Sequence, residues 1–120
     1  MNEYQFVLPY PPTVNTYWRR RGEQYFISKK GQQYRKDVQQ IIRSQHLDIF
    51  TTSRLKIRVI ADAPDRRRRD LDNILKGLLD SLVHAGFAED DEQFDDIHIV
   101  RGEVISGGRV GIKITELEAA

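Results

Sequence analysis

One segment, residues 74–83, limits the possible folds more than any other, because its apolar residues recur at the spacing of one helix face. The stripe comprises Ile74, Leu75, Leu78, Leu79, Leu82 and Val83. A stripe this wide needs an apolar surface to cover it, and the alternating segment 55–62 has the pattern of a half-buried strand. The sequence thus predicts a helix that begins near Leu71, ends at Gly86 and packs against a sheet.

The rest of the chain is expected to complete an α+β domain. A second amphipathic helix is predicted over residues 29–45, with Ser28 as its N-cap. Further strands are expected at residues 4–8, 17–20, 24–27, 97–100 and 110–114. A turn at residues 106–108 would join the last two strands as a hairpin. We expect one domain over residues 1–120, a small mixed or antiparallel sheet with two helices packed on it.

Composition narrows the class of protein. The chain has no Cys, which excludes disulfides, thiolate metal sites and cysteine nucleophiles. It has neither a Walker motif nor a dinucleotide-binding glycine pattern, so no nucleotide cofactor is expected. No apolar run approaches the roughly 18 residues of a membrane span, so we expect no membrane contact and a cytoplasmic location.

Charge is distributed unevenly along the chain. Residues 1–69 hold 15 Lys and Arg against 6 Asp and Glu, whereas residues 70–120 hold 4 against 12. One compact domain with such halves can present a basic face to a polyanion and keep an acidic cluster within that face. The alternative is that the two halves intermingle and neutralise each other.

The densest functional signal is the segment 65–76, DRRRRDLDNILK, followed by the acidic pair Asp90 and Asp91. Asp70 and Asp72 fall at the start of the predicted helix, and Lys76 lies four residues beyond Asp72 on the same face. Carboxylates without Cys or clustered His favour Mg²⁺, with Mn²⁺ as a substitute. If the acidic pair folds back onto the helix, the cluster could hold a cation that activates water for phosphodiester hydrolysis. Lys76 would then stabilise the developing negative charge or help to position the attacking water.

A structural interpretation of the same residues stays open. Asp70 and Asp72 could cap the helix and pair with the neighbouring arginines, a common arrangement at helix starts. In the functional interpretation those arginines bind phosphates, beside the amide of Asn73. The candidate DNA-binding arginines are Arg66, Arg67, Arg68 and Arg69, with Arg19, Arg20 and Arg21 as a second edge. Tyr17 and Trp18 could stack on exposed bases or support the loop, and a core or interface position is favoured for Trp18.

Across nearly its whole length the sequence resembles the RusA family of Holliday-junction resolvases. The shared segments are LPYPPTVN at 8–15, DRRRRDLDN at 65–73, Lys76, Asp80 and GFAEDDEQ at 86–93. The resemblance implies a homodimeric, Mg²⁺-dependent endodeoxyribonuclease that nicks four-way DNA junctions symmetrically in recombination and repair. It also implies catalytic roles for Asp70, Asp72, Lys76 and Asp91, with the three aspartates as metal ligands and Asp90 as a further candidate.

Two other functions remain to be distinguished from this one. A non-catalytic protein of the same fold would bind junctions through its basic half and use its aspartates structurally. Alternatively, a metal-dependent nuclease could act on another nucleic acid.

Overall fold

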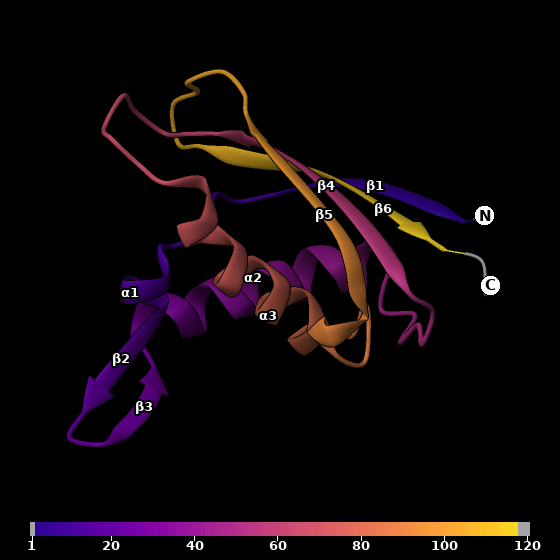
Figure 1. The fold of residues 1–120 in the computed structure, drawn as a ribbon, viewed down its shortest axis with the longest axis horizontal. Helices are drawn as coiled ribbons and strands as arrows, with labels where there is room; N and C mark the ends of the chain where they lie inside the picture. Colours follow the sequence, from indigo (N-terminus) through magenta and orange to yellow (C-terminus); the bar gives the residue numbers. More distant parts are fainter. Residues whose placement is uncertain (1, 118–120) are drawn as a thin grey trace.

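The computed structural model describes residues 2–117 and has the expected α+β architecture, in two layers (Figure 1). One layer is a mixed four-stranded sheet with the strand order β1-β6-β4-β5. Its strands are β1 (Glu3–Leu8), β4 (Leu55–Asp62), β5 (Phe94–Arg101) and β6 (Arg109–Glu116). The other layer contains helices α2 (Lys29–Ser44) and α3 (Leu75–His84), which lie against the same face of the sheet (Figure 1).

Smaller elements lie at the edges of these layers. The short helix α1 (Val14–Tyr17) leads into a two-stranded hairpin formed by β2 (Trp18–Arg21) and β3 (Gln24–Ile27). The hairpin extends away from the body of the molecule (Figure 1). Two 3₁₀ turns, η1 (Leu71–Ile74) and η2 (Asp91–Gln93), precede α3 and β5.

The predicted hairpin between the last two strands is wrong. β5 runs parallel to β4, while β6 pairs antiparallel with both β1 and β4. The connection from β5 crosses the end of β4, where the Gly102 amide donates to the Ala61 carbonyl and the Ile105 amide to the Ala63 carbonyl, both at 2.9 Å. Parallel strands need a crossover connection, and α3 supplies it between β4 and β5.

Both predicted helices form, with their expected end signals. Ser28 caps α2, since its hydroxyl accepts a 3.0 Å hydrogen bond from the Gly31 amide. Gly86 has φ +92°, the conformation that commonly ends a helix. The segment predicted to begin near Leu71 starts as the 3₁₀ turn η1 before it becomes α3.

The core lies between the two layers. The inward side chains of β4, at Leu55, Ile57 and Val59, are at most 1% exposed. The helix stripe meets them, because Ile74, Leu78 and Leu82 are fully buried. The apolar face of the strand thus packs against the apolar stripe of the helix, as the sequence predicts.

A polar cluster connects the three helices. Tyr17 of α1 is completely buried, and its hydroxyl donates to Asp80 of α3. Arg35 of α2 binds the same carboxylate at 2.7 Å and also donates to the Tyr17 hydroxyl at 2.9 Å. Burial is the main cause that raises the pKa of Tyr17, followed by its hydrogen bond to Asp80. Tyr17 is therefore a structural residue: of its two expected roles, the structure agrees with support and excludes stacking on bases.

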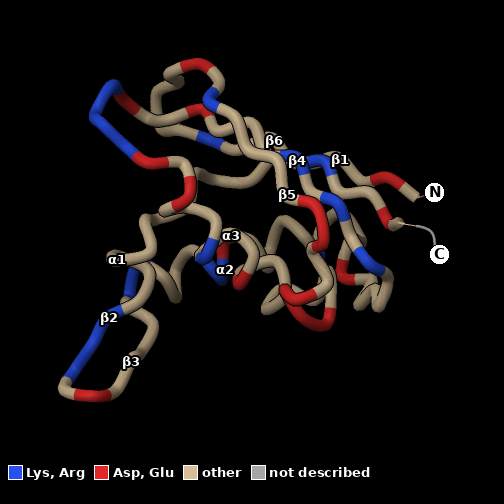
Figure 2. Tube along the Cα trace, viewed as in Figure 1, with Lys and Arg blue, Asp and Glu red and all other residues tan. Residues whose placement is uncertain are grey.

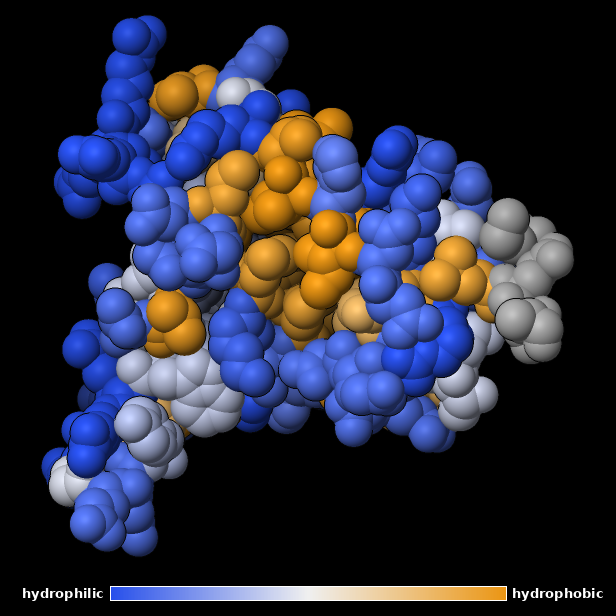
Figure 3. Space-filling model, in the orientation of Figure 1, coloured by the Kyte–Doolittle hydropathy of each residue, from blue (hydrophilic) through white to orange (hydrophobic). Residues whose placement is uncertain are grey.

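The edge strand β5 leaves apolar side chains on the surface. Ile97 and Val100 are exposed, and Val100 lies in register with the exposed Ile60 of β4. Figure 3 shows apolar atoms gathered on the face of the molecule seen in Figure 1. None of the helices within residues 2–117 has the length and apolar character that crossing a membrane requires.

Candidate active site

The arginine-rich loop between β4 and η1 is held in shape by Asp65. Its carboxylate accepts from Arg69 Nη1 at 2.7 Å and from the Arg67 amide at 2.9 Å. The hydrogen bond from Arg69 is the main reason that the pKa of Asp65 falls to about 2. The Arg69 guanidinium also lies over the Tyr10 ring, 5.9 Å from its centroid. Arg69 therefore shapes the loop.

The other arginines of this loop face solvent. The Arg67 side chain is 84% exposed, compared with 17% for Arg69. Arg66 and Arg68 are exposed as well. These three residues are placed to contact a polyanion, whereas most of the Arg69 side chain is enclosed by its own loop.

Asp70 and Asp72 lie at the start of η1, as the sequence predicts. Asp70 occupies the N-cap position, yet its side chain makes no capping hydrogen bond. Asp72 follows in the first turn, and both carboxylates are exposed. A pocket beside Asp70 is lined by Thr13, Arg68, Arg69, Asp70 and Asn73. This geometry removes the main support for a purely capping role of Asp70.

The acidic segment 89–92 is positioned by a buried glutamine that the sequence analysis did not single out. The Gln93 Oε1 accepts from the amides of Glu89 and Asp90 at 3.0 and 2.8 Å. Its Nε2 donates to the carbonyls of Thr51 and Ser53 at 2.8 and 2.9 Å. One side chain thereby fixes the acidic segment to the chain that precedes β4.

Each acidic side chain after Glu89 has its own surroundings. Asp90 caps η2 and accepts a 3.0 Å hydrogen bond from the Glu92 amide. Glu92 pairs with Arg54 at 3.0 Å. Asp91 instead faces Lys76 of α3, with 3.9 Å between its Oδ2 and Nζ. Asp91 is therefore the carboxylate of this segment that faces the motif on α3.

The acidic segment thus folds back as far as Lys76. Asp70 and Asp72 lie just before the N-terminal end of α3, while residues 89–92 follow its C-terminal end (Figure 2). The side chain of Lys76, on the first turn of α3, reaches towards Asp91. Its ammonium group can offset negative charge beside that carboxylate.

The same residues are the candidate ligands of a divalent cation. Within residues 2–117, no three His, Cys, Asp or Glu side chains are grouped closely enough to hold one ion together. The aspartates nevertheless supply the hard oxygen ligands that suit Mg²⁺, which commonly takes one or two carboxylates and completes its shell with water and phosphate oxygens. The donor chemistry fits Mg²⁺, and the convergence of Asp70, Asp72 and Asp91 on one ion stays a prediction.

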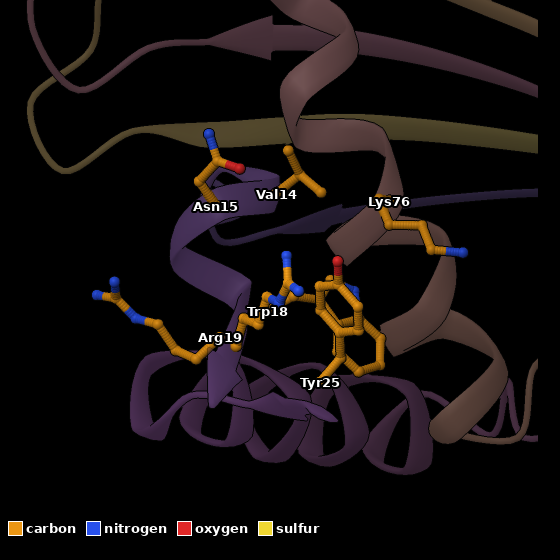
Figure 4. Close-up of a pocket in the computed structure, with 7 residues that line it drawn as sticks. Val14, Asn15, Trp18, Arg19, Tyr25 and Lys76 are labelled. Carbon is orange, nitrogen blue, oxygen red and sulfur yellow. The ribbon is translucent and has the colours of Figure 1, made fainter. Parts of the chain in front are cut away.

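The second arginine set lies on the projecting hairpin. Arg19, Arg20 and Arg21 are all exposed on β2. Figure 2 shows this strand and the arginine-rich loop projecting from the same end of the molecule. Lys76 of α3 lines an open pocket together with residues of α1 and the hairpin (Figure 4). The basic segments, far apart in the sequence, therefore flank the motif that carries Asp70, Asp72 and Lys76.

Comparison with known proteins decides the family. A family model described as endodeoxyribonuclease RusA matches residues 9–115. The chain belongs to the RusA family of endodeoxyribonucleases. It is 80% identical over 119 residues to the crossover junction endodeoxyribonuclease of Enterobacteria phage HK97, covering 99% of each chain. RusA proteins of the same description from Shigella sonnei (strain Ss046) and Enterobacteria phage 82 are each 45% identical over 117 residues, 98% of each chain.

Proposed function

We propose that this protein is an endonuclease that resolves four-way DNA junctions by Mg²⁺-dependent hydrolysis of phosphodiester bonds, in recombination and repair in the cytoplasm. The observation that carries the proposal is the approach of Asp91 to Lys76. Lys76 lies in the first turn of α3, directly after the 3₁₀ turn η1, which has Asp70 at its N-cap position and contains Asp72. The relatives described as crossover junction endodeoxyribonucleases give the substrate class.

The motif residues then divide between holding the cation and stabilising charge. Asp70, Asp72 and Asp91 would hold Mg²⁺, or Mn²⁺ in its place, against a phosphate oxygen of the DNA. Such a cation lowers the pKa of a bound water and offsets charge on the phosphate. Water would attack phosphorus as the bond to the leaving oxygen breaks, the proton lost by the water would reach the leaving oxygen through solvent, and the Lys76 ammonium would stabilise the negative charge that develops. Asp90 serves as a positioning residue, because its carboxylate already caps η2.

The arginines would bind the DNA backbone around this site. Arg66, Arg67 and Arg68 project from one loop, Arg69 of the same loop lines the pocket beside Asp70, and Arg19, Arg20 and Arg21 project from the hairpin. Guanidinium groups bind phosphate with two parallel hydrogen bonds, which fits contacts on either side of a scissile phosphate. Asn73 lines the pocket beside Asp70 and can donate to the same backbone.

We also propose that the active form is a homodimer. A four-way junction has near two-fold symmetry, and paired incisions need two sites related by a two-fold axis. The edge strand β5 supports this proposal, since its exposed Ile97 and Val100 adjoin unpaired backbone groups that a second copy could cover. Sedimentation of the wild type and of Ile97→Lys tests it: a dimer that dissociates in the variant agrees, and a wild-type monomer contradicts it.

The function is tested with synthetic DNA of matched length: a four-way junction, a linear duplex and a single strand, each with Mg²⁺ or with EDTA. We expect paired nicks in the junction with Mg²⁺ alone. Binding without cleavage under any condition would favour the non-catalytic alternative. Equal cleavage of single strands or of RNA would favour a nuclease of another substrate class.

A further inference from the structure

An open pocket of about 800 Å³ separates the projecting hairpin from the motif helix (Figure 4). Its lining combines aromatic rings with positive charge. The lining residues are Val14, Asn15, Trp18, Arg19, Arg20, Tyr25 and Lys76. The lining contains no Asp or Glu, although the whole chain has 18 acidic and 19 basic residues. The pocket is therefore matched to an anionic ligand that also has a flat apolar face.

The hairpin register explains how this surface is built. Arg20 of β2 lies opposite Tyr25 of β3, so the two side chains share one face of the hairpin. The Arg20 guanidinium lies over the Tyr25 ring, 5.7 Å from its centroid, and its Nε donates to the Gly22 carbonyl at 2.5 Å. Phe26 is on the opposite face, in register with Arg19. The hairpin thus holds an aromatic ring and a cation together on its inner side.

Tyr25 is unusually open for an aromatic residue. It is 68% exposed, so packing within the chain does not explain its ring. Trp18 forms the deeper wall, edge-to-face against the buried Tyr17 at 5.7 Å between ring centroids. Its indole Nε1 is the one buried side-chain polar atom within residues 2–117 without a hydrogen-bond partner. Trp18 is consequently held by packing, while Tyr25 presents its ring to whatever enters.

From these features we propose that the pocket binds an unpaired nucleobase of the DNA. The base would stack on Tyr25, and a flanking phosphate would contact Arg20, which shares that face of the hairpin. Aromatic rings beside cations are the general means by which proteins hold single-stranded nucleic acid, because every base has a flat π face. A base in a duplex is stacked on both sides and cannot enter, so the pocket selects DNA whose pairing is interrupted.

The position of Lys76 links this pocket to the proposed chemistry. Lys76 lines the pocket and also lies 3.9 Å from Asp91, so an unpaired base held here would place its own backbone next to the motif helix. This inference deepens the proposed function and rests on it: the pocket would recognise the open centre of a branched substrate beside the cleavage site. Tyr25 would then be a specificity-determining residue outside the catalytic motif.

The chain contains a built-in reporter, since Trp18 is its only tryptophan. The test titrates the full-length protein with a single-stranded oligothymidine and with a blunt-ended, fully paired duplex carrying the same number of phosphates, in EDTA to prevent cleavage. We expect the single strand to quench Trp18 emission and the duplex to leave it unchanged. Equal quenching by the single strand and the duplex would overturn the inference and indicate that the pocket binds phosphate alone. Binding of the single strand without any change in Trp18 emission would also overturn it.

Variants separate stacking from charge and from folding. Tyr25→Ala should weaken single-strand binding about 5- to 150-fold, the range for loss of one base–aromatic stack. Tyr25→Phe should restore it, and Phe26→Ala, on the other face of the hairpin, should leave it unchanged. If Tyr25→Ala instead alters the sedimentation of the protein and not its binding, the surface is an interface between copies and the inference is wrong.

These outcomes are separable from those of the proposed function. If the wild type cleaves junctions and Tyr25→Ala binds single strands normally, the base-binding inference is wrong while the proposed endonuclease function stands. If the wild type cleaves no junction, the proposed endonuclease function is wrong. Quenching of Trp18 emission still tests base binding in the pocket, because it requires no cleavage.

Discussion

The side chains nearest the motif show two kinds of arginine in one loop. Arg69 is bound by Asp65 and lies over Tyr10, while Arg66 and Arg68 are exposed. The sequence of four consecutive arginines does not show which has which role. The difference depends on which guanidinium the Asp65 carboxylate binds, and that is seen only in the structure. We therefore expect Arg69 variants to disturb the loop and Arg68 variants to disturb binding alone.

The titration of Asp65 tests the role of Arg69. Arg69→Gln removes the main cause of the lowered pKa, so the pKa of Asp65 should rise from about 2 towards its ordinary value of 3.8. Because the folded-state pKa is depressed, the pairing stabilises the protein above about pH 4, and this contribution is lost as the pH falls towards 2. The chemical shift of the Asp65 carboxyl carbon, followed by NMR, measures the change. An identical pKa in both proteins would contradict the assignment.

Gln93 is the residue on which the shape of the acidic segment depends. Gln93→Ala removes two accepted and two donated hydrogen bonds at a buried site. We expect the free energy of unfolding to fall by about 2 to 4 kcal/mol, because backbone groups lose their partners. Urea denaturation measures the loss, and Gln40→Ala on the exposed face of α2 should change stability by less than about 0.5 kcal/mol. Equal effects of the two substitutions would contradict this role.

At the scale of elements, α1 depends on close packing against α3. A Cβ added at Gly77 would lie 2.9 Å from Cδ1 of Tyr17, whose ring is buried and whose hydroxyl is hydrogen-bonded. Although alanine usually stabilises a helix relative to glycine, Gly77→Ala should here lower the free energy of unfolding by about 1 to 3 kcal/mol. Thermal or urea unfolding checks this, with His84→Ala on the exposed side of α3 as control. A stabilised Gly77→Ala would show that Tyr17 can move.

The elements with strong periodicity were predictable, and their pairing was not. The alternation in β4 and the stripe in α3 fix which side of each is buried, and the structure confirms both. Strand order depends instead on how the chain after β5 crosses β4, which involves backbone bonds to Ala61 and Ala63 that no side-chain pattern records. The four-residue helix α1 is too short to show a period.

The candidate site divides in the same way. Charge spacing identified Asp70, Asp72 and Lys76 because they are neighbours on one helix start. The approach of Asp91 to Lys76 depends on Gln93, whose buried amide looks like any polar residue in the sequence. Tyr25 was missed for a related reason: only the hairpin register places it beside Arg20 and in the pocket.

At the scale of the whole molecule, the basic segments gather at one end while the acidic segment 89–92 follows the far end of α3 (Figure 2). Such a distribution orients an approaching polyanion before any specific contact forms. The two halves of the sequence nevertheless intermingle, as in the pairs Arg35–Asp80 and Arg54–Glu92, so the concentration of positive charge is local to the arginine-rich loop and the hairpin.

The salt dependence of binding measures this surface. Arg68→Ala should weaken junction binding and reduce the slope of log K against log salt concentration by about one, the value for one lost phosphate contact. Arg43→Ala, in the last turn of α2, removes the same charge and should leave the slope unchanged. If both variants alter the slope equally, binding follows net charge and not the arginine-rich loop.

The central claim, that the motif aspartates act on a DNA phosphate through a divalent cation, is tested most directly by Asp72→Asn. Junction cleavage and junction binding are measured side by side in Mg²⁺, with Asp48→Asn, outside the motif and the acidic segment, as the charge-matched control. We predict that Asp72→Asn cleaves about 10²-fold more slowly or not at all and binds the junction as tightly as the wild type or more tightly, while Asp48→Asn cleaves normally. Normal cleavage by Asp72→Asn, or loss of binding in a correctly folded variant, would contradict the account.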